Sequence, residues 1–185
     1  KPEWFAYYSI KSNNLWIGGG TQWNPEQLSF FGAADIAVTT ADASDYTAIV
    51  SFAQTPDMRI FVNDVQRIKV EGPDVVPAIR DMYRRYNWKH VLLEKQGLSK
   101  PFTQMAQRSG LRVIEVSADK DKITKALPLS ARMEAGDVLF RADAAWVPDL
   151  ERELLTFPLG AHDDMVDALA LGAQHLQNKR TWQAF

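Results

Sequence analysis

The sequence contains no cysteine among its 185 residues, which excludes thiol catalysis, disulfide bonds and cysteine-ligated zinc or iron–sulfur sites. The absence of cysteine also suits a reducing cytosol. No apolar run approaches the roughly 20 residues of a membrane-spanning helix, and no signal-peptide pattern follows Lys1. The net charge of −2 excludes a strongly basic nucleic-acid-binding module at the level of bulk charge, although the 21 Lys and Arg residues can still form a local basic face.

The composition is that of a globular protein, with 46% hydrophobic and 24% charged residues, and the length is that of one domain. Residues 1–30 differ from the rest because they are rich in aromatic residues, include Gly18-Gly19-Gly20 and show no clear periodicity. We therefore divide the chain into an N-terminal arm, residues 1–30, and a folded domain, residues 31–185. The arm either packs on this domain or is the remnant of a junction with an upstream domain, and a first residue other than Met fits an excised fragment or a processed chain.

Hydrophobic periodicity predicts an alternation of strands and helices after residue 30. The predicted strands are 31–38, 46–52, 59–68, 91–94 and 111–116, and the predicted helices are about 74–86, 100–109, 119–134, 151–155 and 162–177. Asp74 is the expected N-cap of the first helix, and Pro128 is expected to break or kink the third. Short connections indicate that the first three strands form an antiparallel meander. A meander followed by alternating helices and strands predicts an α/β fold with a mixed sheet flanked by helices, in the strand order of the ribonuclease H-like fold.

Acidic residues occupy three separate elements of this pattern. Asp35 lies within the first predicted strand among apolar residues, where a charge is costly unless it is compensated. Glu94 ends the fourth strand, and the pair Asp163-Asp164 opens the last helix. Phosphodiester hydrolysis with two divalent ions requires carboxylates from separate elements, because hard oxygen ligands must surround a metal pair about 4 Å apart. We expect these four carboxylates to converge at one edge of the sheet and to hold Mg²⁺ or Mn²⁺.

Each of these positions also has a purely structural interpretation. Asp35 can be a hydrogen-bonded residue in a turn, and Glu94 can be an exposed charge at a strand end. Asp163 and Asp164 can cap the last helix and complement its dipole, although an adjacent pair exceeds what capping requires.

Three neighbours of the carboxylates have open roles. Asp167 lies one helical turn after the pair and is either a third ligand or part of a solvated polar stripe. His162 is either a proton shuttle or phosphate contact, or, as is commoner for a lone histidine before a helix, structural. Asp45 either approaches the metal site or belongs to a hairpin turn, which is its more usual role.

Four blocks of sequence together resemble the nuclease domain of the large terminase subunit from tailed bacteriophages. They are Asp35-Ile-Ala with Asp45-Tyr-Thr-Ala-Ile, Leu92-Leu-Glu94-Lys, residues 121–136 (DKITKALPLSARMEAG) and residues 157–169 (FPLGAHDDMVDAL). The resemblance spans roughly residues 31–175, and the last two blocks are specific as a combination, whereas either alone is weak. The pair Ala33-Ala34 is a mild departure, since many relatives have glycine before the Asp.

The resemblance implies a ribonuclease H-like, divalent-metal-dependent endonuclease that cuts concatemeric double-stranded DNA in the cytoplasm of an infected bacterial host. It implies Asp35, Glu94 and Asp164 as the catalytic, metal-binding triad, with Asp163 assisting and two divalent cations, Mg²⁺ or Mn²⁺, as cofactors. The superfold implies that Asp35 would be shared by both ions, with Asp164 for the ion that would activate water and with Glu94 for the ion that would stabilise the leaving 3′ oxygen. The implied partners are DNA, an upstream packaging ATPase domain, the small terminase subunit and the portal. Because the chain has no Gly-x-x-x-x-Gly-Lys-Ser/Thr loop, we expect it to cut DNA but not to translocate it.

Basic residues follow two of the acidic elements and are candidates for binding the DNA backbone. Lys95 and Lys100 follow Glu94, and a second group lies in the block after the fifth strand: Lys120, Lys122, Lys125 and Arg132. Phosphate contacts of this kind make binding weaken steeply with salt. The alternative is that these side chains are simply solvated, but the position of Lys95 beside a proposed ligand favours phosphate contact. No motif indicates base recognition, so we expect little sequence specificity.

Three other functions are compatible with this pattern to different degrees. A junction resolvase or transposase-like nuclease of the same superfold would use the same carboxylates on a different DNA shape, although a transposase normally needs a separate DNA-binding domain. A non-catalytic ribonuclease H-like docking module is disfavoured because all the acidic positions are filled. A sugar-kinase-like ATPase half is disfavoured because its glycine-rich phosphate turns are missing.

Overall fold

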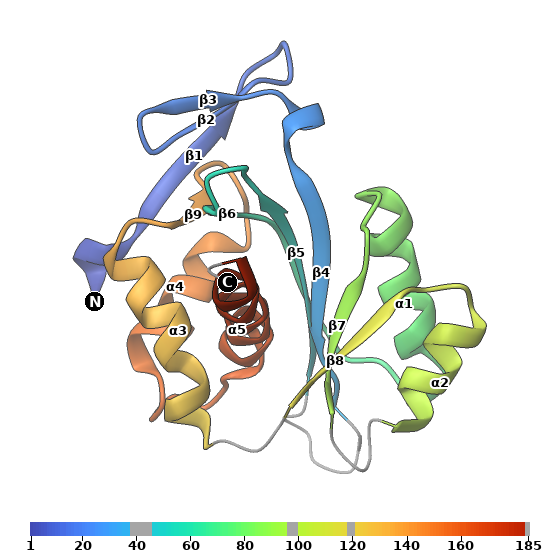
Figure 1. The fold of residues 1–185 in the computed structure, drawn as a ribbon. Helices are drawn as coiled ribbons and strands as arrows, with labels where there is room; N and C mark the ends of the chain where they lie inside the picture. The colour runs from blue at the N-terminus through green and yellow to red at the C-terminus, as the bar shows by residue number, and fades with distance from the viewer. Residues whose placement is uncertain (38–45, 96–99, 118–120, 184–185) are drawn as a thin grey trace.

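The computed structural model describes residues 1–37, 46–95, 100–117 and 121–183, with side chains described as far as residue 176. These residues form one mixed sheet of nine strands with helices on both faces (Figure 1). The strands are β1 (Ala6–Ile10), β2 (Trp16–Gly18), β3 (Thr21–Trp23), β4 (Ser29–Asp35), β5 (Thr47–Gln54), β6 (Ile60–Ile68), β7 (Val91–Lys95), β8 (Val113–Ser117) and β9 (Val138–Arg141). The helices are α1 (Gly72–Arg85), α2 (Lys100–Arg108), α3 (Lys122–Glu134), α4 (Val147–Thr156) and α5 (Asp164–Gln183). The predicted mixed sheet flanked by helices is confirmed.

The centre of the sheet brings the ends of β4 and β7 together. The strand order is β3-β2-β1-β9-β6-β5-β4-β7-β8, in which β4, β5 and β6 form the predicted antiparallel meander and β7 runs parallel to β4. Parallel strands end at the same edge of a sheet. The register pairs Ala34 with Leu93, so the next residues, Asp35 and Glu94, lie side by side just beyond this parallel pairing, at the end of β4 and near the end of β7.

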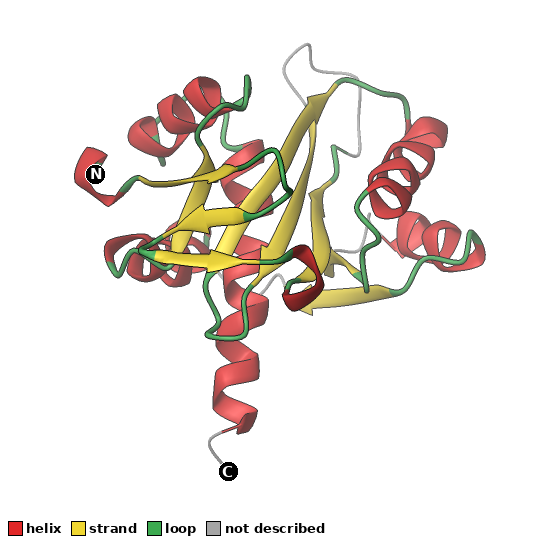
Figure 2. Ribbon diagram, turned by 90° about the horizontal axis from the view of Figure 1, so that it is seen from above, coloured by secondary structure: helices red, strands yellow, loops and turns green. Residues whose placement is uncertain are grey.

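The two faces of the sheet carry separate apolar cores. Helices α1 and α2 lie on one face, and α3, α4 and α5 lie on the other (Figures 1 and 2). The first core packs Ile79 and Met82 of α1 against Ile49 and Leu93, and the second includes Leu169 of α5. No helix in the described part of the chain is long and apolar enough to cross a membrane.

Helix α5 lies close against the sheet because of a glycine. A Cβ atom at Gly172 would come within 2.5 Å of the Phe52 ring on β5, so only glycine permits this approach. The first turn of the same helix carries Asp164 and Asp167. The packing of α5 on β4 and β5 therefore determines where these acidic residues lie relative to the ends of the strands.

Residues 6–23 contribute three strands to this same sheet. Strand β1 pairs in parallel with β9, with Tyr8 opposite Arg141, and β2 and β3 extend the sheet beyond it. The aromatic residues of this segment form a third core, in which the Tyr8 ring stacks on Trp16 and on Phe61 of β6. The aromatic composition of the segment thus has a local explanation, because its rings pack against β6 and β9.

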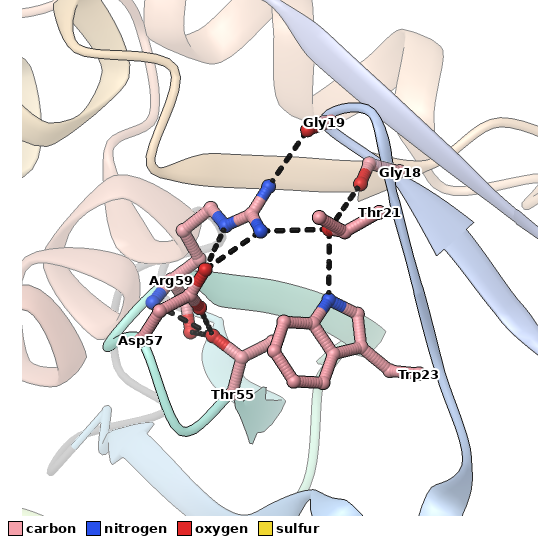
Figure 3. Close-up of polar contacts among 7 residues, drawn as sticks. All are labelled: Gly18, Gly19, Thr21, Trp23, Thr55, Asp57 and Arg59. Carbon is pink, nitrogen blue, oxygen red and sulfur yellow. Dashed lines mark hydrogen bonds and ion pairs between the residues drawn. The ribbon is translucent and has the colours of Figure 1, made fainter.

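An arginine ties the β2–β3 hairpin to the turn before β6 (Figure 3). The Arg59 guanidinium donates to the Gly19 carbonyl oxygen at 3.0 Å and to Thr21 Oγ1 at 2.7 Å. It also donates twice to Asp57 Oδ2, at 2.7 and 3.0 Å. Thr21 Oγ1 in turn accepts from the Trp23 indole N–H and donates to the Gly18 carbonyl. This network joins residues that are about 40 positions apart in the chain.

Two helix features differ from the expectation of a cap at Asp74 and from that of a break at Pro128. Helix α1 begins at Gly72 with Glu71 at the N-cap, so Asp74 lies in the first turn rather than at the cap. Pro73 is compatible with this earlier start. The backbone N–H groups of a first helical turn have no partner within the helix, so proline loses no hydrogen bond there. Helix α3 is not broken at Pro128, since it continues to Glu134 and buries Leu129 and Met133 beyond the proline.

Other elements also differ from the predicted ones in presence or in bounds. Strand β9 was not predicted, and α4 is longer than residues 151–155. The last helix begins at Asp164 rather than at His162, and its regular structure extends to Gln183.

Candidate metal centre

Five carboxylates gather where β4, β7 and α5 meet. Asp35 ends β4, Glu94 lies near the end of β7, and the other three precede or occupy the first turn of α5: Asp163, Asp164 and Asp167. Their proximity acts on Asp35, whose pKa is raised to about 8 by burial and then by the charges of Asp167, Glu94, Asp164 and Asp163. Like charges this close disfavour ionisation of each other unless cations share them.

The first turn of α5 is held by a carboxylate from α4. Glu153, which is only 5% exposed, accepts hydrogen bonds through Oε1 from the backbone N–H groups of Met165 and Val166, at 2.8 and 3.0 Å. These are N–H groups that have no partner within the helix. The Asp163 carbonyl also accepts from the Asp167 N–H at 2.8 Å, which closes the turn. The acidic residues of α5 therefore stand on a capped and well-defined backbone.

A small cavity lies between three of the carboxylates. Its volume is about 10 Å³, enough for one water molecule. Asp35, Glu94 and Asp167 line it together with Lys125, and its remaining walls come from Ala170, Leu171 and Gln174 of α5. Burial, followed by the charge of Asp163, raises the pKa of Asp167 to about 6. Asp167 is thus placed with Asp35 and Glu94, whereas Asp163 and Asp164 are not among the residues that line this cavity.

Two lysines from α3 supply the counter-charge. The Lys125 ammonium forms an ion pair with Glu94 Oε1, and the Lys122 ammonium lies 2.5 Å from Asp163 Oδ2 and 3.9 Å from Asp167 Oδ2. The lysines are three residues apart and therefore lie on one face of the helix. No three acidic or histidine side chains in the described residues are arranged to hold one ion.

Asp164 faces a different neighbour. Its Oδ2 is buried without a hydrogen-bond partner and lies 3.8 Å from the Arg67 Nε at the end of β6. Burial raises the pKa of the Asp164 carboxyl, and the charges of Arg67 and His162 oppose that rise. A buried carboxylate oxygen without a hydrogen bond is a hard donor that is available for a cation.

The predicted DNA contacts differ in their exposure. Lys95 and Lys100 are exposed at the end of β7 and the start of α2, and Lys122 is exposed on α3. Arg132 is 7% exposed and donates through Nη1 to the Met58 carbonyl oxygen at 3.0 Å, so little of its side chain is accessible to a phosphate in this structure. It lies on the buried face of α3 with Leu129 and Met133. Lys120 and Asp45 lie outside the described residues.

Residues 32–176 match the sequence model of the family described as terminase RNaseH-like domain. This chain belongs to that family. The predicted family resemblance is thereby confirmed, and with it the ribonuclease H-like fold. No curated protein sequence matches the chain significantly.

Solved terminase structures share the fold of this terminase domain. The large terminase nuclease from thermophilic phage G20c with bound zinc is 17% identical with a TM-score of 0.68, over 93% of this chain and 94% of that one. The Thermus phage P74-26 large terminase nuclease domain is 17% identical with a TM-score of 0.63, over 80% of each chain. A large terminase from another thermophilic bacteriophage is 9% identical with a TM-score of 0.63, over 79% of this chain. This terminase domain spans 39% of that longer terminase chain.

The sequence of this terminase domain left the role of Asp167 open and indicated none for Glu153 and Arg67. Asp167 carried a signal, since it lies one turn after an acidic pair, but the sequence does not show that its face of α5 meets Asp35. No local sequence pattern points to Glu153 or Arg67, because each of them contacts a residue that is distant in the chain.

Proposed function

We propose that this terminase domain is a divalent-metal-dependent endodeoxyribonuclease that hydrolyses phosphodiester bonds of double-stranded DNA. The observation that carries the proposal is the gathering of five carboxylates where β4, β7 and α5 meet, three of which, Asp35, Glu94 and Asp167, line one cavity. Burial of Asp35, followed by the charges of the other four, raises its pKa to about 8. Hydrolysis with two divalent ions needs such a set. The related G20c nuclease, which has the same fold, has been solved with bound magnesium, cobalt and zinc.

The residues present fit divalent cations. All the donors are carboxylate oxygens, the ligands that Mg²⁺ and Mn²⁺ prefer. One of them, Asp164 Oδ2, is buried without a hydrogen bond, and two others have lysine ammonium groups as their partners. A divalent cation that takes the place of an ammonium group also brings positive charge close to the carboxylates, and so it relieves the repulsion among them. We infer that metal binding displaces Lys122 and Lys125 from the oxygens.

Asp35, Glu94 and Asp164 would hold two ions, with Asp163 assisting. When bound, such ions supply an activated water and stabilise charge on the leaving 3′ oxygen. Asp35 is central because every other carboxylate of the set acts on its pKa. Lys122 and Lys125, once released from the carboxylates, remain at the site on a capped helix, since the Asp121 side chain accepts from the Thr124 N–H at 3.0 Å. Their ammonium groups can then contact the phosphates that flank the cut.

Binding of the DNA backbone is assigned to lysines around the site. Lys95 and Lys100 lie beyond Glu94 on the β7 side, and Lys122 and Lys125 lie on the α3 side. Contacts to phosphates carry no sequence information, so we propose cutting with little sequence specificity. We further propose that this domain works within a longer terminase with a packaging ATPase domain, the small subunit and the portal, in the cytoplasm of an infected host.

The experiment that tests this function measures nicking and linearisation of supercoiled plasmid with Mn²⁺, with Mg²⁺ and with EDTA. Wild type is compared with Asp35→Asn and with Asp81→Asn, a control at an exposed position on α1. We expect cleavage that requires metal, falls at least about 100-fold in Asp35→Asn and is unchanged in Asp81→Asn. Cleavage by Asp35→Asn at the wild-type rate would contradict the proposed site. A four-way junction run in parallel identifies a resolvase if it is cut in preference to duplex.

A further inference from the structure

Arg67 lies at the end of β6 with little hydrogen bonding of its own. Its guanidinium carbon lies 4.1 Å from the centroid of the Tyr46 ring, a cation–π contact that orients the planar group. Its Nε is buried, has no hydrogen-bond partner and is 3.8 Å from Asp164 Oδ2, which is too long for a hydrogen bond. The side chain is nevertheless 25% exposed. Arg67 is therefore held by the contact with the Tyr46 ring while a quarter of its side chain stays accessible.

The accessible part of Arg67 borders two open cavities. One has a volume of about 300 Å³ and is also lined by Arg152 and His162, and the other, of about 390 Å³, lies on the side of Trp146. The first reaches the size of an ordinary ligand pocket. His162 also meets the Tyr46 ring edge-on, with ring centroids 5.6 Å apart. One aromatic ring thus positions both an arginine and a histidine at the mouth of this cavity.

The acidic residues of the 300 Å³ cavity are partnered through one oxygen each. Asp149 Oδ1 forms an ion pair with Arg152 at 3.0 Å. Glu153 accepts through Oε1 from the backbone N–H groups of Met165 and Val166, and its Oε2 is buried without a hydrogen bond. Arg67, His162 and the exposed Arg152 of that ion pair are the basic side chains that line this cavity.

Basic groups thus reach the carboxylates of α5 from two elements. Lys122 of α3 contacts Asp163 and Asp167, and Arg67 of β6 faces Asp164. A duplex whose cut phosphate lies at these carboxylates continues past them in both directions, and its neighbouring phosphates need cations on each side. A stacked guanidinium is well suited to this, since its planar fork matches the oxygens of a phosphate.

We propose that Arg67, supported by Tyr46 and assisted by His162, binds a backbone phosphate of the DNA next to the carboxylates, on the β6 side of the site. This inference rests on the proposed nuclease function for its ligand, but it concerns binding and not cleavage. A competing role for Arg67 is that of a counter-ion that only positions Asp164. The two roles differ in what they predict for DNA binding without metal.

The test measures binding of a fluorescently labelled duplex by anisotropy in EDTA, over a series of salt concentrations. The variants are Arg67→Met, Arg67→Lys and Arg84→Met, the last at an exposed position on α1 as the matched loss of charge. We expect Arg67→Met to weaken binding about three- to tenfold and to lower the slope of log K against log salt by about 1. Arg67→Lys keeps the positive charge but lacks the planar guanidinium, so we expect a smaller loss of DNA affinity and an unchanged salt slope. Arg84→Met is expected to bind as wild type.

Wild-type affinity and slope in Arg67→Met would overturn the phosphate site. If calorimetry then shows altered Mn²⁺ affinity in that variant, Arg67 is a positioning residue for Asp164. Thermal unfolding reports whether Arg67→Met is folded. If it is not, Arg67→Lys serves as the test. A loss of DNA affinity in Arg67→Lys no greater than that in Arg84→Met would then reject a contact between the Arg67 guanidinium and a phosphate. Loss of duplex binding in Arg67→Met, with no metal-dependent cleavage by wild type, would support the phosphate site and reject the nuclease.

Discussion

The Lys125 ammonium group forms an ion pair with the Glu94 carboxylate and so joins α3 to the end of β7. The side chains are 16% and 11% exposed, so water screens the pair only partly. Together with Lys122, this lysine gives the metal-free site its positive charge. The same residues that would assist DNA binding therefore stabilise the carboxylates when no metal is bound.

Removal of this lysine is expected to strengthen metal binding and weaken the metal-free fold. In Lys125→Met a divalent cation no longer competes with an ammonium group for Glu94, so we expect Mn²⁺ to bind about fivefold more tightly by calorimetry. The free energy of unfolding in EDTA should fall by about 1–3 kcal/mol, because a partly buried carboxylate loses its partner. Lys89→Met, at an exposed position, is the control. Unchanged or weaker Mn²⁺ binding in Lys125→Met would show that the ion pair does not oppose the metal.

Glu153 is expected to be a major determinant of stability. Glu153→Ala leaves the N–H groups of Met165 and Val166 buried without an acceptor, which should lower the free energy of unfolding by about 2–4 kcal/mol in urea denaturation. Glu153→Gln keeps an oxygen at this position and should lose less than half as much. Equal losses in the two variants would show that the negative charge, and not the hydrogen bonds, stabilises the start of α5.

The carboxylate cluster predicts an unusual dependence of stability on pH. The pKa of Asp35 is raised to about 8 and that of Asp167 to about 6, so these two carboxyls bind more protons in the folded protein than in the unfolded chain between about pH 4 and 8. In EDTA their contribution to the free energy of unfolding therefore falls as the pH rises through this range. The carboxyls with lowered pKa, such as Asp57, titrate below it.

The variant Asp35→Asn isolates the contribution of Asp35 to this effect. Without its titration, the decline between pH 6 and 8 should be much smaller, and the variant should be more stable than wild type at pH 8 in EDTA. Urea denaturation at several pH values measures both. A wild-type stability that rises from pH 6 to 8 in the presence of chelator would contradict the raised pKa.

Arg59 is expected to hold the N-terminal hairpin without affecting the site. Arg59→Met removes the hydrogen bonds to Gly19 and Thr21, so amide protons of residues 16–23 should exchange faster, by a factor that corresponds to about 1–3 kcal/mol. Plasmid cleavage should be unchanged, since the network lies outside the carboxylate set. Arg112→Met, at an exposed position on the other edge of the sheet, should change neither. Faster exchange that extends to β4 and β7 would show that the hairpin stabilises the whole sheet.

Pattern and periodicity were enough for the centre of the fold. Strands β4 to β8 are long or strongly apolar, and their neighbours along the chain are mostly their neighbours in the sheet. Strands β1, β2, β3 and β9 could not be found in this way, because they are three to five residues long and β1 pairs with a strand some 130 positions away, Tyr8 opposite Arg141. Pro128 does not break α3 because burial of Leu129 and Met133 beyond it outweighs the hydrogen bond that proline cannot make.

The sequence by itself determined the chemistry of the candidate site: hard carboxylate donors at Asp35, Glu94 and the Asp163-Asp164 pair, with lysines nearby and no thiol. Those identities follow from residue type and from position at the ends of elements, which are local properties. Only the tertiary structure decided which groups face one another. It placed Asp167 in the cavity with Asp35 and Glu94, buried Arg132 against the Met58 carbonyl, and left Arg67 stacked on Tyr46. Such choices depend on how α3 and α5 pack across the sheet, and packing joins residues that no local pattern relates.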